Sequence, residues 1–143
     1  MTLPTRRLGT NGPEVTSVGL GLMGIAAMYG VPGSDEERFR VLDHVYASGQ
    51  RHWDTADMYG DSEELVGKWF ARNPGKRENI FLATKFGFVG NGVVRNDEEY
   101  ARQQLDRSLK LLQTDYIDLY YVHRIDPGAP IETTMQTMVK LRE

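Results

Sequence analysis

Three apolar, β-rich runs in this sequence end in polar or ionisable residues, and a segment with a helical pattern follows each run. The runs are RHWDTADMYG, NIFLATKFGF and YIDLYYVHR. Strands that alternate with helices predict βαβ units, in which the strands are parallel. The carboxyl ends of such strands meet at the mouth of a parallel barrel, where polar side chains collect into sites. The sequence therefore predicts a shared site for Asp54, Tyr59, Lys85 and His123.

The helix starts are predicted from capping patterns. A residue whose side chain can accept a hydrogen bond from a backbone N–H, followed three positions later by an acidic residue, is typical of the start of a helix. Proline also suits the first turn, because its missing N–H has no partner there in any case. The expected starts are Ser34 with Glu37, Asp61 with Glu64, Asn96 with Glu99, and Pro130, whose helix would carry Met135, Met138 and Leu141.

The N-terminal segment is predicted to form a β-hairpin that leads into a first buried strand near residues 18–22. The turn Asn11-Gly12-Pro13 marks the hairpin. The glycines at 19, 21 and 24 match the G-x-G-x-x-G dinucleotide pattern, which requires a helix that contains the third glycine. Gly30, Pro32 and Gly33 oppose a helix before Ser34. We therefore favour a glycine-rich strand end and pocket loop over a Rossmann fingerprint.

Composition narrows the classes of partner. Lysine and arginine total 17 against 20 acidic residues, which gives a net charge of −3. The chain therefore lacks the positive field that would favour binding to nucleic acid or to an anionic membrane. The chain has no cysteine and only three histidines, which argues against disulfides and a zinc site, so no metal is expected. With no membrane-spanning run, the expectation is one domain over residues 1–143 in the cytoplasm.

The four polar residues have the chemistry needed to reduce a carbonyl group. A tyrosine hydroxyl is a poor acid at neutral pH because its ordinary pKa is about 10. A neighbouring ammonium favours the phenolate, and a carboxylate keeps that ammonium charged and oriented. Tyr59 could then protonate a carbonyl oxygen, with Lys85 and Asp54 in support and His123 orienting the substrate.

Structural roles stand beside these assignments. Asp54 could accept loop amides, Tyr59 could be a loop aromatic, and His123 could be a satisfied barrel histidine. Lys85 carries the strongest single argument, because a lysine within an apolar strand is costly unless a partner or a function retains it. Tyr121 is assigned mainly to the core.

The segments WDTADMYGDSEELVGK, ATKFG and YVHRIDP, with the opening RRLGTNGPEV and GLGLMG, closely resemble the aldo-keto reductase family. The match extends over nearly the whole chain. The resemblance implies a (β/α)8 TIM barrel that binds NADPH and transfers its hydride to an aldehyde or ketone. It also implies a catalytic set of Asp54, Tyr59, Lys85 and His123.

The resemblance further implies that Gly21, Leu22, Met23 and Asp54 approach the nicotinamide ribose. His123 and Phe86 are the expected substrate-binding residues. A complete barrel takes roughly 250 residues, so the expected fold is the N-terminal half of one, preceded by the hairpin and truncated after about four strand-helix units. In the family, the other half of the barrel supplies most of the residues that bind NADPH.

Three functions remain open at this point. The first is an NADPH-dependent reductase that is active when a second half completes the barrel. The second is a catalytically silent half-barrel that serves as an interaction module, and the third is a cofactor-sensing binding protein. A half-barrel also leaves sheet edges unpaired, and such edges can pair with a second copy of the chain, so homo-oligomers are possible partners.

Overall fold

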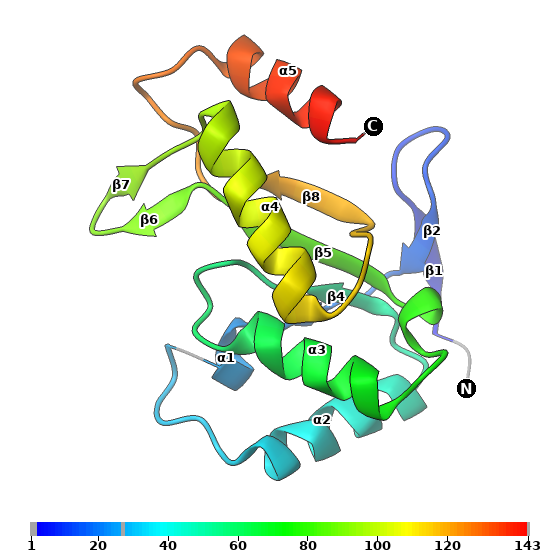
Figure 1. The fold of residues 1–143 in the computed structure, drawn as a ribbon. Helices are drawn as coiled ribbons and strands as arrows, with labels where there is room; N and C mark the ends of the chain where they lie inside the picture. The colour runs from blue at the N-terminus through cyan, green and yellow to red at the C-terminus, as the bar shows by residue number, and fades with distance from the viewer. Residues whose placement is uncertain (1–2, 27, 143) are drawn as a thin grey trace.

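A computed structural model describes residues 3–26 and 28–142 and contains a four-stranded parallel sheet (Figure 1). Its strands, in spatial order, are β3 (Leu20–Gly21), β4 (His52–Asp54), β5 (Phe81–Phe86) and β8 (Leu119–Val122). The register pairs Gly21 with Asp54 and Lys85 with Tyr121. Strand order follows chain order, so each strand-helix unit adds to the edge left by the preceding one. This is the topology of half of a (β/α)8 barrel.

Helices connect the strands, and two hairpins lie outside the sheet. The helices are α1 (Met23–Ala26), α2 (Asp35–Ala47), α3 (Ser62–Arg72), α4 (Glu98–Leu112) and α5 (Ile131–Leu141), with a short 3₁₀ helix at Arg77–Asn79. The hairpins pair β1 (Thr5–Arg7) with β2 (Glu14–Thr16) and β6 (Phe88–Gly90) with β7 (Val93–Val94). The predicted N-terminal hairpin and strand-helix alternation are therefore confirmed.

The capping predictions have mixed outcomes. Ser34 caps α2 in a full capping box with Glu37, as predicted. Asp61 occupies the N-cap position of α3 but makes no capping bond, because its carboxylate pairs with Arg38. The prediction that Asn96 caps α4 is wrong by one residue. Asp97 is the cap and accepts the amide of Tyr100, which leaves the Asn96 side chain available for another contact.

Two predictions near the N-terminus need correction. The first sheet strand is only Leu20–Gly21, and Val18 is 70% exposed, so a buried strand from residue 18 is wrong. One helical turn, α1, begins at Met23, before the expected first helix at Ser34. Its four residues are too few for the long helix of a dinucleotide-binding unit.

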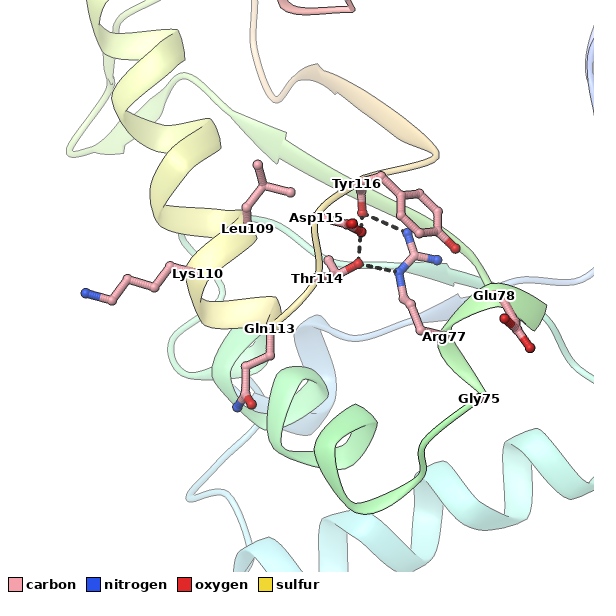
Figure 2. Close-up of a pocket in the computed structure, with 9 residues that line it drawn as sticks. All are labelled: Gly75, Arg77, Glu78, Leu109, Lys110, Gln113, Thr114, Asp115 and Tyr116. Atoms are coloured by element: carbon pink, nitrogen blue, oxygen red, sulfur yellow. Dashed lines mark hydrogen bonds between the residues drawn. The ribbon is translucent and has the colours of Figure 1, made fainter.

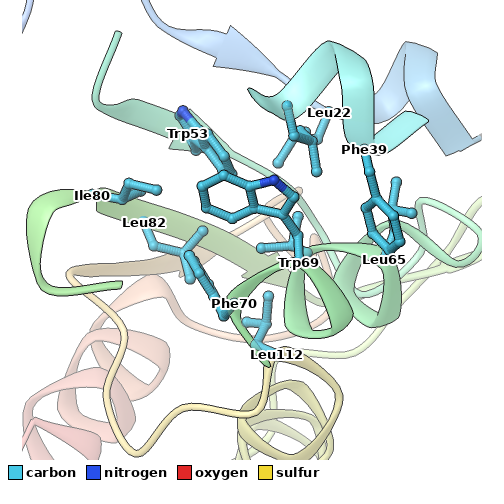
Figure 3. Packing of buried hydrophobic residues seen from close by; sticks show 11 residues of the cluster. Leu22, Phe39, Trp53, Leu65, Trp69, Phe70, Ile80, Leu82 and Leu112 are labelled. Atoms are coloured by element: carbon cyan, nitrogen blue, oxygen red, sulfur yellow. The ribbon is translucent and has the colours of Figure 1, made fainter. Parts of the chain in front are cut away.

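The hydrophobic core lies on one face of the sheet, under α2 and α3 (Figure 3). Trp53 of β4 and Trp69 of α3 are fully buried, with ring centroids 4.9 Å apart. Strand alternation sends neighbouring residues to opposite faces, so Trp53 and Leu82 face the helices while Asp54 and Lys85 face the other side. The second face, which lines the lumen of a barrel, carries the predicted polar residues.

The last helix, α5, follows Pro130, which is its N-cap and not part of its first turn as predicted. Thr134 and Thr137 are its buried residues. Met138 and Leu141 border a hollow against α4 and β8, whereas Met135 is 55% exposed. Within residues 3–26 and 28–142, no helix has the length and apolar character required to cross a membrane.

Candidate active site

Three neighbouring strands bring the predicted catalytic residues together. Asp54 ends β4, Lys85 lies near the end of β5, and His123 follows β8 directly. Tyr59 comes from the turn between β4 and α3, where its amide donates to the carbonyl of Ala56. All four side chains therefore lie at the carboxyl end of the sheet, as the sequence predicted.

The ammonium of Lys85 is the centre of the cluster. Its Nζ donates to Asp54 Oδ1 at 2.5 Å, to the carbonyl oxygen of Thr55 at 2.8 Å and to Tyr59 Oη at 3.1 Å. An ammonium has three donors, so these three acceptors use all of them. The Lys85 side chain is only 9% exposed, and the Asp54 carboxylate offsets the cost of burying its charge. Tyr59 Oη accepts this bond and keeps its own proton available for donation.

Tyr121 belongs to the same cluster, which corrects its assignment to the core. Its hydroxyl donates to Asp54 Oδ2, so the two oxygens of Asp54 bind Tyr121 and Lys85 separately. Burial and the Asp54 carboxylate raise the pKa of Tyr121 well above its ordinary value. The sequence signal is its place two residues before His123, which directly follows β8, since residues i and i+2 of an extended chain share a face.

His123 lies beside Tyr59, with ring centroids 5.4 Å apart and planes nearly perpendicular. Its other neighbour is Phe88 of β6, at 5.9 Å. The pKa of His123 is lowered below its ordinary value of 6.5, mainly because the ring is buried. The positive charges of Lys85 and Arg124 lower it further. The ring is therefore neutral at pH 7 and can supply a hydrogen bond without adding a second positive charge beside Lys85.

The residues predicted to approach a nicotinamide group begin at the end of β3. Gly21 is exposed beside Asp54, and the space where a side chain would start is open. Met23 is half-buried at the start of α1. The Leu22 side chain is fully buried in the core, and its amide donates to the carbonyl of Asp54. A planar ring could therefore approach Gly21, but not the side chain of Leu22.

The prediction that Phe86 binds substrate does not agree with its position. Phe86 is fully buried and stacks on Tyr120, with centroids 4.9 Å apart. Tyr120 donates to the carbonyl of Ala101 in α4, which places this aromatic pair on the helix side of the sheet. The physical reason is strand alternation: next to a lumen-facing Lys85, Phe86 must face the helices.

Asp57 and Glu63 are two buried carboxyl groups that lie behind the cluster. Burial, with the nearby charge of Glu63, raises the pKa of Asp57 to about 7. Burial also raises the pKa of Glu63, whose Oε1 accepts from Thr84 at 2.7 Å. The backbone of Asp57 is anchored as well, because its amide donates to the carbonyl of Lys85 and its carbonyl accepts from Arg107.

A separate pocket opens at the other end of the sheet, beside the 3₁₀ helix and the loop before β8 (Figure 2). Arg77 donates to Thr114 Oγ1 at 3.1 Å and to the carbonyl of Tyr116 at 2.9 Å. Asp118 pairs with the same guanidinium. These bonds join the two loops, so the role of Arg77 is structural. In the part of the chain that the structure describes, no group of three or more acidic or histidine side chains could hold a metal ion.

The model of the aldo/keto reductase family matches residues 17–143. The chain belongs to the aldo-keto reductase family. It is 51% identical to the aldo-keto reductase str7 of Strobilurus tenacellus over 99% of this chain and 42% of that protein. Identity to the aldo-keto reductase yakc [NADP(+)] of Schizosaccharomyces pombe is 44%, over 100% of this chain and 43% of the relative.

Solved aldo-keto reductase structures have the same fold. The holo form of AKR11C1 from Bacillus halodurans superposes with a TM-score of 0.83 and 32% identity, over 98% of this chain and 46% of that structure. The chain thus spans less than half the length of these aldo-keto reductases. Its elements correspond to one half of their barrel.

Proposed function

We propose that this chain carries the proton-transfer centre of an aldo-keto reductase that reduces an aldehyde or ketone to an alcohol with NADPH. The observation that carries the proposal is the arrangement around Lys85. Its three donors are taken by Asp54, the Thr55 carbonyl and Tyr59 Oη, so the Tyr59 O–H remains free to point elsewhere. A structural lysine would need acceptors, but it would not need a tyrosine hydroxyl at the open face of the sheet.

In the proposed reaction, Tyr59 donates its proton to the carbonyl oxygen of the substrate. Lys85 holds the resulting phenolate by the hydrogen bond that it already makes, and Asp54 keeps the ammonium in place. The neutral His123 donates a hydrogen bond to the same oxygen and thereby orients the carbonyl. The proton enters at oxygen and a hydride at carbon, which together give the alcohol.

NADPH, when bound, supplies that hydride. The residues present fit the nicotinamide end of such a cofactor, because Gly21 leaves open space directly beside Asp54. The name of the yeast relative, which specifies NADP(+), supports the choice of NADPH over NADH. Gly21, Met23 and Asp54 are the proposed contacts, with Leu22 as their support in the core.

The proposed partners are a small carbonyl compound and a second half-barrel, including a second copy of this chain. The chain spans 42% and 43% of two relatives, which favours a requirement for additional barrel strands. The predicted cytoplasmic location, and the predicted absence of nucleic-acid, membrane and metal partners, stay predictions.

The test is a titration of the purified chain with NADPH, followed by cofactor fluorescence, and then an assay of NADPH oxidation with a panel of aldehydes and ketones. We expect saturable binding, and turnover where the chain assembles into a completed barrel. Tyr59→Phe should leave binding unchanged and slow turnover at least about 100-fold, because general acid catalysis contributes about 10²- to 10⁴-fold. Tyr116→Phe, which removes the hydroxyl of a 42% exposed tyrosine outside the cluster, is the matched control.

Equal turnover in Tyr59→Phe and the unchanged chain would contradict the role of Tyr59. Saturable binding without turnover would favour the cofactor-sensing function. A folded chain that binds no NADPH would favour the silent interaction module. Intact mass and oligomeric state are measured on the same sample, so that an assembled barrel is distinguished from a single half.

A further inference from the structure

The side-chain amide of Asn96 is buried, and the capping of α4 does not explain why. It is 2% exposed and directly precedes Asp97, the residue that caps α4. Because Asp97 accepts the first-turn amide, Asn96 has no capping role. Burying an amide without full hydrogen bonding costs free energy. The contacts that Asn96 makes therefore need an explanation of their own.

The side chain of Asn96 bridges the end of β5, which carries Lys85, and the segment after β8, which begins with His123. Its Nδ2 donates to the carbonyl of Arg124 at 3.0 Å, immediately after His123. Its Oδ1 lies against Gly87, where a Cβ would come within 2.3 Å of this oxygen. Gly87 also has φ +105, so both the available space and the backbone conformation favour glycine there. Asn96 thus packs tightly between β5 and the segment after β8.

Two backbone bonds surround this contact. The amide of His123 donates to the carbonyl of Phe86 at 2.7 Å, and the amide of Arg95 donates to the carbonyl of Gly87 at 2.8 Å. Together with the Asn96–Arg124 bond, they hold the loop before α4, the end of β5 and the start of the loop after β8 in one arrangement. His123 is at the edge of the sheet, where no further strand in residues 3–26 and 28–142 supports it from the other side.

We propose that Asn96 is a positioning residue that fixes the ring of His123 beside Tyr59 by holding the carbonyl of Arg124. The ring of His123 lies between Tyr59 and Phe88, and a shift of the backbone at Arg124 moves it directly. The catalytic relevance of Asn96 rests on the role proposed above for His123. The positioning itself is a property of this chain and can be measured without turnover.

The test uses the three histidines of the chain, His44, His52 and His123, as probes in one NMR titration. Burial lowers the pKa of His123 in the unchanged chain, so a ring released toward water regains a higher value. We expect Asn96→Ala to raise the pKa of His123 back toward its ordinary value of 6.5. The ring chemical shifts of His44 and His52 stay the same in the variant. Single His→Gln variants assign the three signals.

Asn73→Ala is the matched control, because it removes a comparable bond of 2.9 Å from an asparagine amide to the carbonyl of Trp69, at the end of α3. This variant should leave the His123 signal unchanged. Asn96→Ser, which keeps a small polar group, is titrated in parallel so that the result does not depend on the folding of the alanine variant. A selective shift of His123 in either folded Asn96 variant supports the proposal.

The proposal is overturned if His123 keeps its pKa and ring chemical shifts in the folded Asn96 variants. It is equally overturned if Asn73→Ala shifts His123 as far as Asn96→Ala does, because the effect would then follow general stability. These outcomes are independent of the Tyr59→Phe assay. A failed reductase assay with a selective His123 shift would therefore reject the proposed reaction and retain the positioning role.

Discussion

Asp54 links the charged and aromatic parts of the cluster through its two carboxylate oxygens. One oxygen accepts from Lys85 and the other from Tyr121, which come from adjacent strands at paired positions. This arrangement fixes the carboxylate from two sides before any substrate arrives. Preorganised groups of this kind need little rearrangement during a reaction, which is a main source of catalytic rate.

Behind this cluster, Asp57 makes the stability of the chain dependent on pH. Its pKa rises from an ordinary value of 3.8 to about 7 because it is buried and lies near Glu63, against the opposing charges of Arg107 and Lys85. Between about pH 4 and 7 the folded chain holds a proton that the unfolded chain has lost. The free energy of unfolding therefore falls as the pH rises through this window, and the loss is complete above it.

Asp57→Asn should flatten this dependence, because the amide stays neutral in both states. We expect the variant to be more stable than the unchanged chain at pH 8, by on the order of 2 to 4 kcal/mol, and the difference to shrink toward pH 4. Urea unfolding at pH 5 and pH 8 measures it. Asp115→Asn, at an exposed loop position, is the control. Parallel pH profiles for the Asp57 variant and the unchanged chain would contradict the prediction.

At the scale of the elements, α3 and α4 cross at a glycine. A Cβ on Gly67 of α3 would come within 2.0 Å of the carbonyl oxygen of Leu111 in α4. This obstacle is backbone and cannot rotate away, so the helices could accommodate a larger residue only by moving apart. Close contact here brings α4, and with it Asp97 and the neighbouring Asn96, into place over β5 and β8.

Gly67→Ala should therefore destabilise the chain, although alanine normally favours a helix over glycine by about 1 kcal/mol. We expect a loss of at least about 1 to 3 kcal/mol in the free energy of unfolding, the usual cost of overpacking. Chemical denaturation measures it. Ala71→Gly, at an exposed position of the same helix, should cost no more than about 1 kcal/mol. A stabilised Gly67 variant would show that the crossing is not tight.

The sequence predicts the elements better than their orientation. Alternating patterns identify the strands, and the Ser34 capping box identifies the start of α2, because both signals are local. Asp97 and Asn96 are both good caps, so only tertiary contact with Arg124 decides which of them caps α4. Phe86 faces the helices because strand alternation places it opposite Lys85, and only the folded sheet shows that Lys85 faces the lumen. The burial of Asp57 does not follow from the sequence, because it depends on α3 and α4.

At the scale of the whole molecule, the sheet is open along two strands. Within residues 3–26 and 28–142, β3 and β8 are its edges, and Leu119 of β8 is 39% exposed. Unpaired strand edges are templates for pairing with another chain. The same residues would meet neighbouring strands in the longer relatives.

The chain should therefore self-associate as its concentration rises, as measured by analytical ultracentrifugation. A lysine on an edge strand opposes edge-to-edge pairing, so Leu119→Lys should shift the distribution toward the monomer. Val41→Lys, at a 48% exposed position on α2, should leave it unchanged. A chain that sediments as one monomeric species at all concentrations would contradict this prediction.

The order of the strands also bears on how the protein is made. Each strand pairs with the one synthesised just before it, from β3 through β4 and β5 to β8. Domains begin to fold from the N-terminus while the ribosome adds about 5 to 20 residues per second. Every side chain of the cluster around Lys85 has been translated once His123 has been added. The proposed proton-transfer centre can thus assemble on the nascent chain without waiting for a distant segment.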